Sequence, residues 1–275
     1  MLPKTFSSDI ETDRVVIDAY LDRLLHNQGS GPVVDAMRYA VLSGGQRLRP
    51  LLSLRVARML NSECAGTMRA AAAVELLHCA SLIVDDLPCM DNSPVRRGQP
   101  AAHVAFGESI AVLAAFAMVA LAARSLVDGD LDDAETLRLL RFQKRLLRTL
   151  DCSSLIAGQA MDLQLTGEVR LRELPAISEL KTVPLFQLAF HAGAIFANVA
   201  PETEATLDVL GYEFGMAYQM ADDYLDGEDS DVERLTAQFE RTRQLMRGCE
   251  GRTEILEDIL EYMYGKTLEA DCSHR

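Results

Sequence analysis

Residues 75–91 of the 275-residue chain read ELLHCASLIVDDLPCMD, in which an apolar segment runs directly into a cluster of acidic residues. The apolar part extends back to residue 68 and carries only two charged residues, Arg69 and Glu75. A helix that is apolar on all sides belongs at the centre of a bundle rather than on its surface. The stretch therefore predicts a buried core helix with carboxylates at its end.

A second apolar segment, residues 207–221, ends in the same way, in the sequence DDYLD. Asp222 and Asp226 lie one helical turn apart, so their charges repel unless a cation lies between them. In the first cluster a proline breaks the helix, and the excursion that follows can carry Asp91 back toward Asp85. Mg²⁺ prefers hard oxygen ligands and is usually held by one or two carboxylates together with substrate phosphates. The two clusters therefore predict a site in which magnesium ions clamp a diphosphate.

Helical signals dominate the rest of the chain. Apolar residues recur at spacings of three and four, and alternating strand patterns are scarce. Breakers between the periodic stretches indicate about ten helices. Because no linker, repeat or low-complexity tract interrupts the chain, we expect residues 1–275 to form a single all-α domain. The longest uncharged apolar run, residues 109–123, is shorter than the roughly 20 residues that span a bilayer, so it predicts a buried core helix and no membrane span.

The charge and cysteine content indicate which partners and which cellular compartment to expect. The chain has 41 acidic and 27 basic residues and a net charge of −14, which repels nucleic-acid phosphates, so nucleic acid is not an expected partner. The six cysteines form no CxxC pair. The first residues, MLPKTFSSDIETD, carry acids where a signal peptide needs a basic and then an apolar stretch. We therefore expect a reduced, cytoplasmic protein.

Basic residues flank the acidic clusters. Arg96 and Arg97 follow the first cluster, Lys181 and Thr182 start an apolar stretch, and GGQRLRP at 44–50 places two arginines beside a flexible turn. Arginine makes forked, directional contacts with phosphate, and lysine offers a point charge. Their combination with the carboxylates favours a diphosphate ligand.

These motifs together resemble the trans-polyprenyl diphosphate synthases, such as geranylgeranyl and farnesyl diphosphate synthases. The matching stretches, in family order, are GGQRLRP at 44–50, the opening segment with its flank to residue 100, GQAMDL at 158–163, KTVPL at 181–185 and YQMADDYLD at 218–226. The resemblance implies an all-α isoprenoid synthase fold around a deep central cavity, and a homodimer. It also implies isoprenoid diphosphate substrates and Mg²⁺, with about three ions when substrate is bound.

The resemblance assigns roles to individual residues. The metal ligands would be Asp85, Asp86, Asp91, Asp222, Asp223 and Asp226. The first four of these, together with Lys181, would be the catalytic residues. The allylic diphosphate would be held by Arg96, Lys181, Thr182 and Gln219, and isopentenyl diphosphate by Gln46, Arg49, His78 and Arg97. The implied reaction ionises the allylic C–O bond, lets the isopentenyl double bond attack the cation, and releases a proton. Ala80 and Ser81 stand where bulky family residues close the cavity floor, which implies a product near C20 rather than C15.

The chain departs from the family at several positions. Gln46 replaces a lysine, Phe116 replaces an aspartate and Ala102 replaces a threonine, while GEDSDVE at 227–233 supplies only acids where the family has a lysine-bearing loop. Losing one charged hydrogen bond to phosphate costs about 1.5–3 kcal/mol. Three hypotheses therefore stay open: a chain-elongating prenyltransferase first, then a class I terpene cyclase that acts on a C15–C20 diphosphate without isopentenyl diphosphate, and then a non-catalytic partner subunit.

Overall fold

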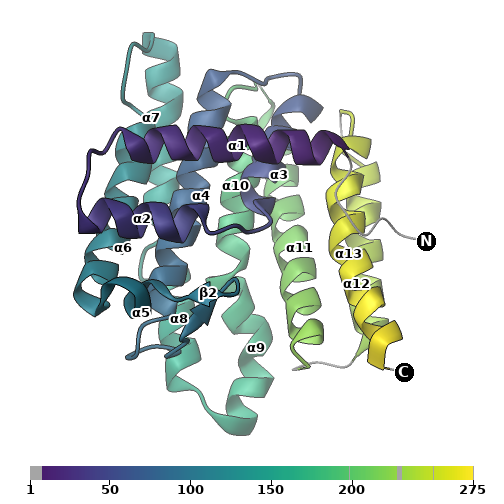
Figure 1. Cartoon of the computed structure of the whole chain (residues 1–275). Coiled ribbons are helices and arrows are strands. Elements are labelled where there is room, and N and C mark those ends of the chain that lie inside the picture. The colour runs from purple at the N-terminus through teal and green to yellow at the C-terminus, as the bar shows by residue number, and fades with distance from the viewer. Residues whose placement is uncertain (1–7, 198, 228–230, 250, 275) are drawn as a thin grey trace.

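The computed structural model describes residues 8–274 except 198, 228–230 and 250, and it describes the side chains of these residues except 8, 171 and 266–274. This part of the chain forms thirteen helices and one short antiparallel hairpin, arranged as a helical bundle (Figure 1). The elements are α1 (Ser8–His26), α2 (Pro32–Leu42), α3 (Leu48–Met59), α4 (Ala65–Asp85), β1 (Val95–Arg96), β2 (Gln99–Pro100), α5 (Ala102–Phe106), α6 (Glu108–Ser125), α7 (Asp133–Thr149), α8 (Leu155–Gln164), α9 (Gly167–Lys181), α10 (Val183–Ala194), α11 (Pro201–Leu225), α12 (Val232–Arg247) and α13 (Glu254–His274). The sequence predicts about ten helices, and some extra boundaries fall at single residues: Gly107, with a positive φ of 85°, separates α5 from α6.

Helix α4 lies at the centre of the bundle, as the opening stretch predicts. It packs against α3, α6 and α10, and most of its side chains are buried (Figure 1). Four consecutive alanines, residues 70–73, are all buried, and small side chains let neighbouring helices approach closely. The last turn of α4 then carries Asp85 to the end of the core.

Glycines set the distance between the helices that surround α4. A Cβ at Gly193 on α10 would lie 2.4 Å from the backbone oxygen of Ser53 on α3, and one at Gly215 on α11 would lie 2.9 Å from Cα of Val183 on α10. Neither helix pair leaves room for a side chain at these points, so any larger residue would push the helices apart. The close packing fixes the relative positions of α3, α10 and α11, which all contribute to the site.

A buried ion-pair network holds the turn before α3. Arg47 adopts a left-handed backbone conformation with φ 54°. Its Nε donates to Asp18 on α1 at 2.7 Å and its Nη1 donates to Glu75 on α4 at 2.9 Å. Removing one partner from a buried pair of this kind typically costs about 3–5 kcal/mol, because the other charge stays buried. The network therefore fixes the GGQRLRP segment against two helices.

Helix α6 corrects the prediction of a fully buried helix at residues 109–123. One face packs on α2 and α4, but Leu113 is 52% exposed and Phe116 is 71% exposed on the other. By length and composition alone, α4 and α6 are both apolar enough to cross a membrane, with 67% and 39% of their windows buried inside the protein. Core helices of soluble proteins pass the same test, so this is weak evidence for a span.

Candidate active site

A cavity of about 610 Å³ opens between the ends of α4 and α11, the turn before α3, and helices α8, α9 and α10. Cavities of this size commonly hold small molecules. Most of the residues that the sequence predicts for the site lie in its wall. These are Gln46, Arg49, His78, Ser81, Asp85, Asp91, Arg96, Arg97, Lys181, Thr182, Gln219, Asp222, Asp223 and Asp226.

Two predicted residues lie elsewhere. Asp86 is buried beside the cavity, where its carboxylate accepts from Nε of Arg96 at 3.0 Å. A residue next to Asp85 on a helix points about 100° away from it, which turns Asp86 inward and does not favour its predicted role as a metal ligand. Ala80 is also buried and is not among the cavity-lining residues, although its neighbour Ser81 is.

The two acidic clusters sit where their helices stop. α4 ends at Asp85, and the chain then folds back so that the backbone N–H of Asp91 donates to the carbonyl of Asp85 at 2.9 Å. The predicted excursion of the first cluster is thus confirmed. α11 ends at Leu225, with the N–H of Asp226 bonded to the carbonyl of Asp222 at 2.9 Å. Both sets of carboxylates reach the same cavity.

The cations around the two aspartate clusters do not fully offset the negative charge of their carboxylates. Burial raises the pKa of Asp85 to about 6; the charge of Lys181 opposes this shift and that of Asp91 adds to it. Asp222 lies at the more exposed mouth, where loss of hydration and then the charges of Asp226 and Asp223 raise its pKa to about 6. Each group would be stabilised as an anion by an added cation.

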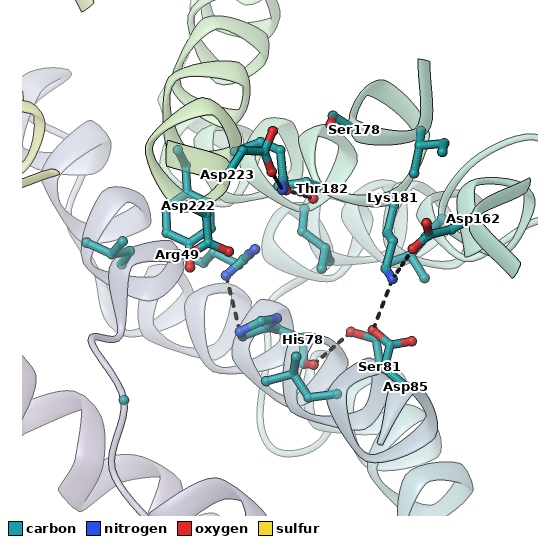
Figure 2. A pocket seen from close by; sticks show the side chains of 18 of the residues that line it. Arg49, His78, Ser81, Asp85, Asp162, Ser178, Lys181, Thr182, Asp222 and Asp223 are labelled. Atoms are coloured by element: carbon teal, nitrogen blue, oxygen red, sulfur yellow. Dashed lines mark hydrogen bonds and ion pairs between the residues drawn. The ribbon is translucent and has the colours of Figure 1, made fainter. Parts of the chain in front are cut away.

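At the other end of the cavity, Arg49 is a buried positive charge without a carboxylate partner among the described residues. Its guanidinium is buried over the ring of Phe186, with Cζ 4.7 Å from the ring centroid, and its Nε has no hydrogen-bond partner among the described residues. Nη1 lies 3.2 Å from Nε2 of His78, and Figure 2 shows these two side chains facing each other. Because arginine only donates, Nε2 of His78 must accept.

His78 remains neutral in this setting. Burial, then the charges of Arg49 and Arg97, lower the pKa of His78 well below its usual value. Burial likewise lowers the pKa of Arg49. A buried cation without a carboxylate partner carries a large desolvation cost, so this end of the cavity favours an anionic ligand.

Arg97 also lines the cavity and lies beside the turn before α3. Its Nη1 donates to the carbonyl of Gly44 at 2.6 Å, and a Cβ at Gly45 would lie 2.7 Å from its Cζ. Gly45 is therefore required for the close approach of the guanidinium. Gln46 lines the cavity beside it as a neutral amide, as the sequence predicts.

A chain of ion pairs that the sequence does not predict links α8, α9 and the end of α4. Lys181 Nζ donates to one carboxylate oxygen of Asp162 at 3.0 Å and lies 3.9 Å from Asp85, as Figure 2 shows. Arg170 Nε donates to the other oxygen of Asp162 at 2.8 Å. A Cβ at Gly158 would lie 2.5 Å from the backbone nitrogen of Lys181, so glycine lets α8 place Asp162 here. The only signal for Asp162 was its place in the motif GQAMDL, and Arg170 gave none.

Helices α10 and α11 are joined at the cavity by a short chain of hydrogen bonds. Thr182 Oγ1 donates to Oε1 of Gln219 at 2.6 Å, and Nε2 of Gln219 donates to Asp223 at 2.7 Å. The chain fixes the orientation of the Gln219 amide. The acidic loop predicted at 227–233 continues from here, but its residues 228–230 lie outside the described part of the chain.

The donor set fits a hard divalent cation. Asp85, Asp91 and the cluster around Asp222 present only carboxylate oxygens, which suit magnesium. Among the residues that the structure describes, no three acidic, histidine or cysteine side chains lie close enough to hold a metal by themselves. Magnesium usually completes its coordination with water and substrate phosphate, so the arrangement suits a metal that binds together with an anionic ligand.

The raised pKa of Asp85 has a consequence for stability. An aspartate in an unfolded chain has a pKa near 3.9, so between about pH 4 and pH 6 the folded protein binds more protons at Asp85 than the unfolded chain does. The ionised carboxylate therefore destabilises the fold, fully above about pH 6 and less as the pH falls toward 4.

We expect Asp85→Asn to raise the urea midpoint of the metal-free protein at pH 8, because the variant lacks the unfavourable charge. The advantage should shrink as the pH is lowered from 6 toward 4. Asp130→Asn, in the exposed connection between α6 and α7, is the matched control and should differ from the wild type equally at each pH. An advantage of Asp85→Asn that does not change with pH would contradict this assignment.

Relatives among known proteins agree with the geometry. Over 204 residues, covering 72% of this chain, it is 38% identical to geranylgeranyl pyrophosphate synthase 10 of Arabidopsis thaliana; it spans 59% of that protein's length. It is 35% identical over 216 residues to farnesyl diphosphate synthase of Geobacillus stearothermophilus, covering 78% of this chain and 72% of the relative. A solved FPP/GFPP synthase from Zymomonas mobilis superposes with a TM-score of 0.83 at 29% identity, covering 93% of this chain and 99% of the other.

The family model described as polyprenyl synthetase matches residues 32–235, which include both aspartate clusters. The solved structures that this chain resembles share the all-α isoprenoid synthase fold. The chain therefore belongs to the polyprenyl synthetase family.

Proposed function

We propose that the chain is a Mg²⁺-dependent short-chain trans-prenyltransferase that condenses an allylic diphosphate with isopentenyl diphosphate. The observation that carries the proposal is the presence of two unlike anion-binding ends in one cavity. One end combines carboxylates with Lys181, and the other combines Arg49, Arg97 and the neutral His78. Two ends suit two diphosphates, whereas an enzyme that only ionises one diphosphate needs only the first.

The allylic diphosphate binds at the carboxylate end. Asp85, Asp91 and Asp222 are the residues that would hold Mg²⁺, which when bound neutralises the charge of a phosphate leaving group. Lys181 lies 3.9 Å from Asp85 and is directed by Asp162, so it can donate to the diphosphate as charge builds on the departing oxygen. Thr182 and Gln219 orient the ester beside it.

Isopentenyl diphosphate binds at the arginine end. Its phosphates take up the unused Nε donor of Arg49 and the guanidinium of Arg97, and a charged hydrogen bond of this kind is worth about 1.5–3 kcal/mol. Gln46 offers an amide N–H where a lysine would offer a charge, so this site binds more weakly than a site with lysine.

The apolar part of the cavity protects the intermediate. Leu155, Ile177 and Leu185 line it, and a carbocation survives only where water is excluded. The small side chain of Ser81 in the same wall favours a longer product, near C20 rather than C15.

The activity is tested by incubating the protein with Mg²⁺, isopentenyl diphosphate and allylic diphosphates of five, ten or fifteen carbons, and identifying the products by mass spectrometry. We expect elongated diphosphates that form only when both substrates are present. Gln46→Lys should lower the KM for isopentenyl diphosphate about ten- to a hundredfold, because it restores one charged contact.

Asp222→Asn is the control against a contaminating host synthase and should lose most of the activity. A hydrocarbon or alcohol formed from a C15 or C20 diphosphate alone would contradict the proposed condensation and identify the protein as a cyclase. No turnover of any substrate, together with tight binding to a second prenyl synthase, would identify a partner subunit instead.

We also propose that the protein forms a homodimer through the exposed face of α6. Leu113 and Phe116 project from this face, and the adjoining helix α7, joined to α6 by a bond from Gln143 to the carbonyl of Ala123, exposes Leu137 and Leu140. Exposed apolar patches of this kind mark protein interfaces, and a second copy offers the same surface in a symmetric dimer.

Leu113→Asp should shift the molar mass measured by light scattering from dimer to monomer, since it places a charge within the proposed interface. Val16→Asp, at an equally exposed apolar position on α1, is the matched control and should leave the mass unchanged. A monomeric wild-type protein, or a dimer unaffected by Leu113→Asp, would overturn the proposed interface.

A further inference from the structure

Tyr218 lines the cavity at its arginine end and has no assigned role. It lies on α11, one helical turn before Asp222. Its ring packs against the ring of Phe186, with the two centroids 5.2 Å apart, and Cζ of Arg49 lies 5.6 Å from the centroid of Tyr218. Because Cζ of Arg49 is also 4.7 Å from the centroid of Phe186, the two rings together hold the guanidinium.

The hydroxyl of Tyr218 has no hydrogen-bond partner among the described residues; the contacts of this side chain there are the two made by its ring. The side chain is only partly buried, and it forms part of the cavity wall. The O–H of a tyrosine in such a setting usually has a partner. This hydroxyl can therefore bond a molecule that enters the cavity.

The surroundings keep the hydroxyl protonated. Burial is the largest cause that raises the pKa of Tyr218, and the charges of Asp222 and Asp226 add to it, while those of Arg49 and Arg97 oppose it. The net shift is upward, so the phenol keeps its proton at neutral pH and can donate. It offers an anion a contact without adding charge to a wall that already holds acids and arginines.

The ring contacts favour one of the two diphosphates as the acceptor. At the carboxylate end, Thr182 and Gln219 are already bonded in a chain to Asp223. Tyr218 instead packs beside Arg49, at the end where Gln46 supplies a neutral amide in place of a cation. A further donor here strengthens the binding of an anion that Gln46 binds weakly.

We propose that Tyr218 is a further substrate-binding residue, whose hydroxyl donates a hydrogen bond to the diphosphate of isopentenyl diphosphate beside Arg49. The inference rests on the proposed function. A hydrogen bond to a charged acceptor raises affinity about tenfold or more, so the hydroxyl offsets part of the affinity lost through the neutral Gln46.

Tyr218→Phe removes the hydroxyl and keeps the ring with its contacts to Phe186 and Arg49. Titration of isopentenyl diphosphate in the presence of EDTA, followed by ³¹P NMR, measures binding at the arginine end alone, because the carboxylates need Mg²⁺ to hold a diphosphate. We expect Tyr218→Phe to bind about tenfold more weakly than the wild type. Tyr20→Phe is the matched control, because Tyr20 is a partly buried tyrosine on α1 that does not line the cavity.

Two further measurements show where the hydroxyl acts. Tyr218→Phe should keep the wild-type midpoint of thermal unfolding, because the lost hydroxyl bonds to no described residue. It should also keep the wild-type affinity for inorganic pyrophosphate in the presence of Mg²⁺, which measures the carboxylate end. In the condensation assay, the KM for isopentenyl diphosphate should rise about tenfold, with the KM for the allylic diphosphate unchanged.

The outcomes separate this inference from the proposed function. Weaker binding of isopentenyl diphosphate by Tyr218→Phe, with Tyr20→Phe unchanged, supports the contact even if the wild type condenses no substrates. Wild-type affinity in Tyr218→Phe would overturn the contact while condensation stands. A loss confined to pyrophosphate with Mg²⁺, or a lower unfolding midpoint in Tyr218→Phe alone, would also overturn it, since the hydroxyl would then serve the carboxylate end or the fold.

Discussion

The structure depends on keeping buried charges of opposite sign apart within one cavity. Arg49 is a buried guanidinium whose Nε donor has no partner within the described part of the chain, and Asp85 is a mostly buried carboxylate whose pKa is raised to about 6. Direct pairing would relieve both, but the two groups sit on different helices that close packing holds in place. The protein thereby stores unfavourable electrostatics that a ligand with both anionic phosphate and bound cation can relieve.

The helices maintain this separation through contacts that are far from the chemistry. Glycines at residues 193 and 215 fix α10 against α3 and α11, while the network around Arg47 anchors the turn that carries Arg49. α4 joins the two ends, since His78 and Asp85 lie two turns apart on it and both face the cavity. A change in helix packing would therefore move the two ends of the site relative to one another.

Much of the site could be predicted from the sequence, because its residues lie in contiguous motifs and their side-chain types indicate what they bind. Two aspartate clusters at the ends of apolar helices indicated a cation site, and the turn that returns Asp91 to Asp85 followed from a proline. The sequence could not predict that Asp86 points inward, because Asp85 and Asp86 lie at the same helix end and differ only in their angle about the helix axis. Arg170 is one of many charges on a polar helix, and only the tertiary contact with Asp162 distinguishes it. The exposed face of α6 was also missed, because a helix that is apolar on all sides looks buried until its neighbours are known.

The central claim is that metal and diphosphate bind this cavity together, each supplying what the other lacks. Calorimetric titration of Mg²⁺ and of inorganic pyrophosphate, each with and without the other, measures that coupling directly. We predict weak binding of Mg²⁺ or pyrophosphate alone and much tighter binding of each in the presence of the other. The affinity should rise by the same factor in both directions once the association of Mg²⁺ with free pyrophosphate is subtracted. Tight binding of pyrophosphate without Mg²⁺, or of Mg²⁺ without pyrophosphate, would contradict it.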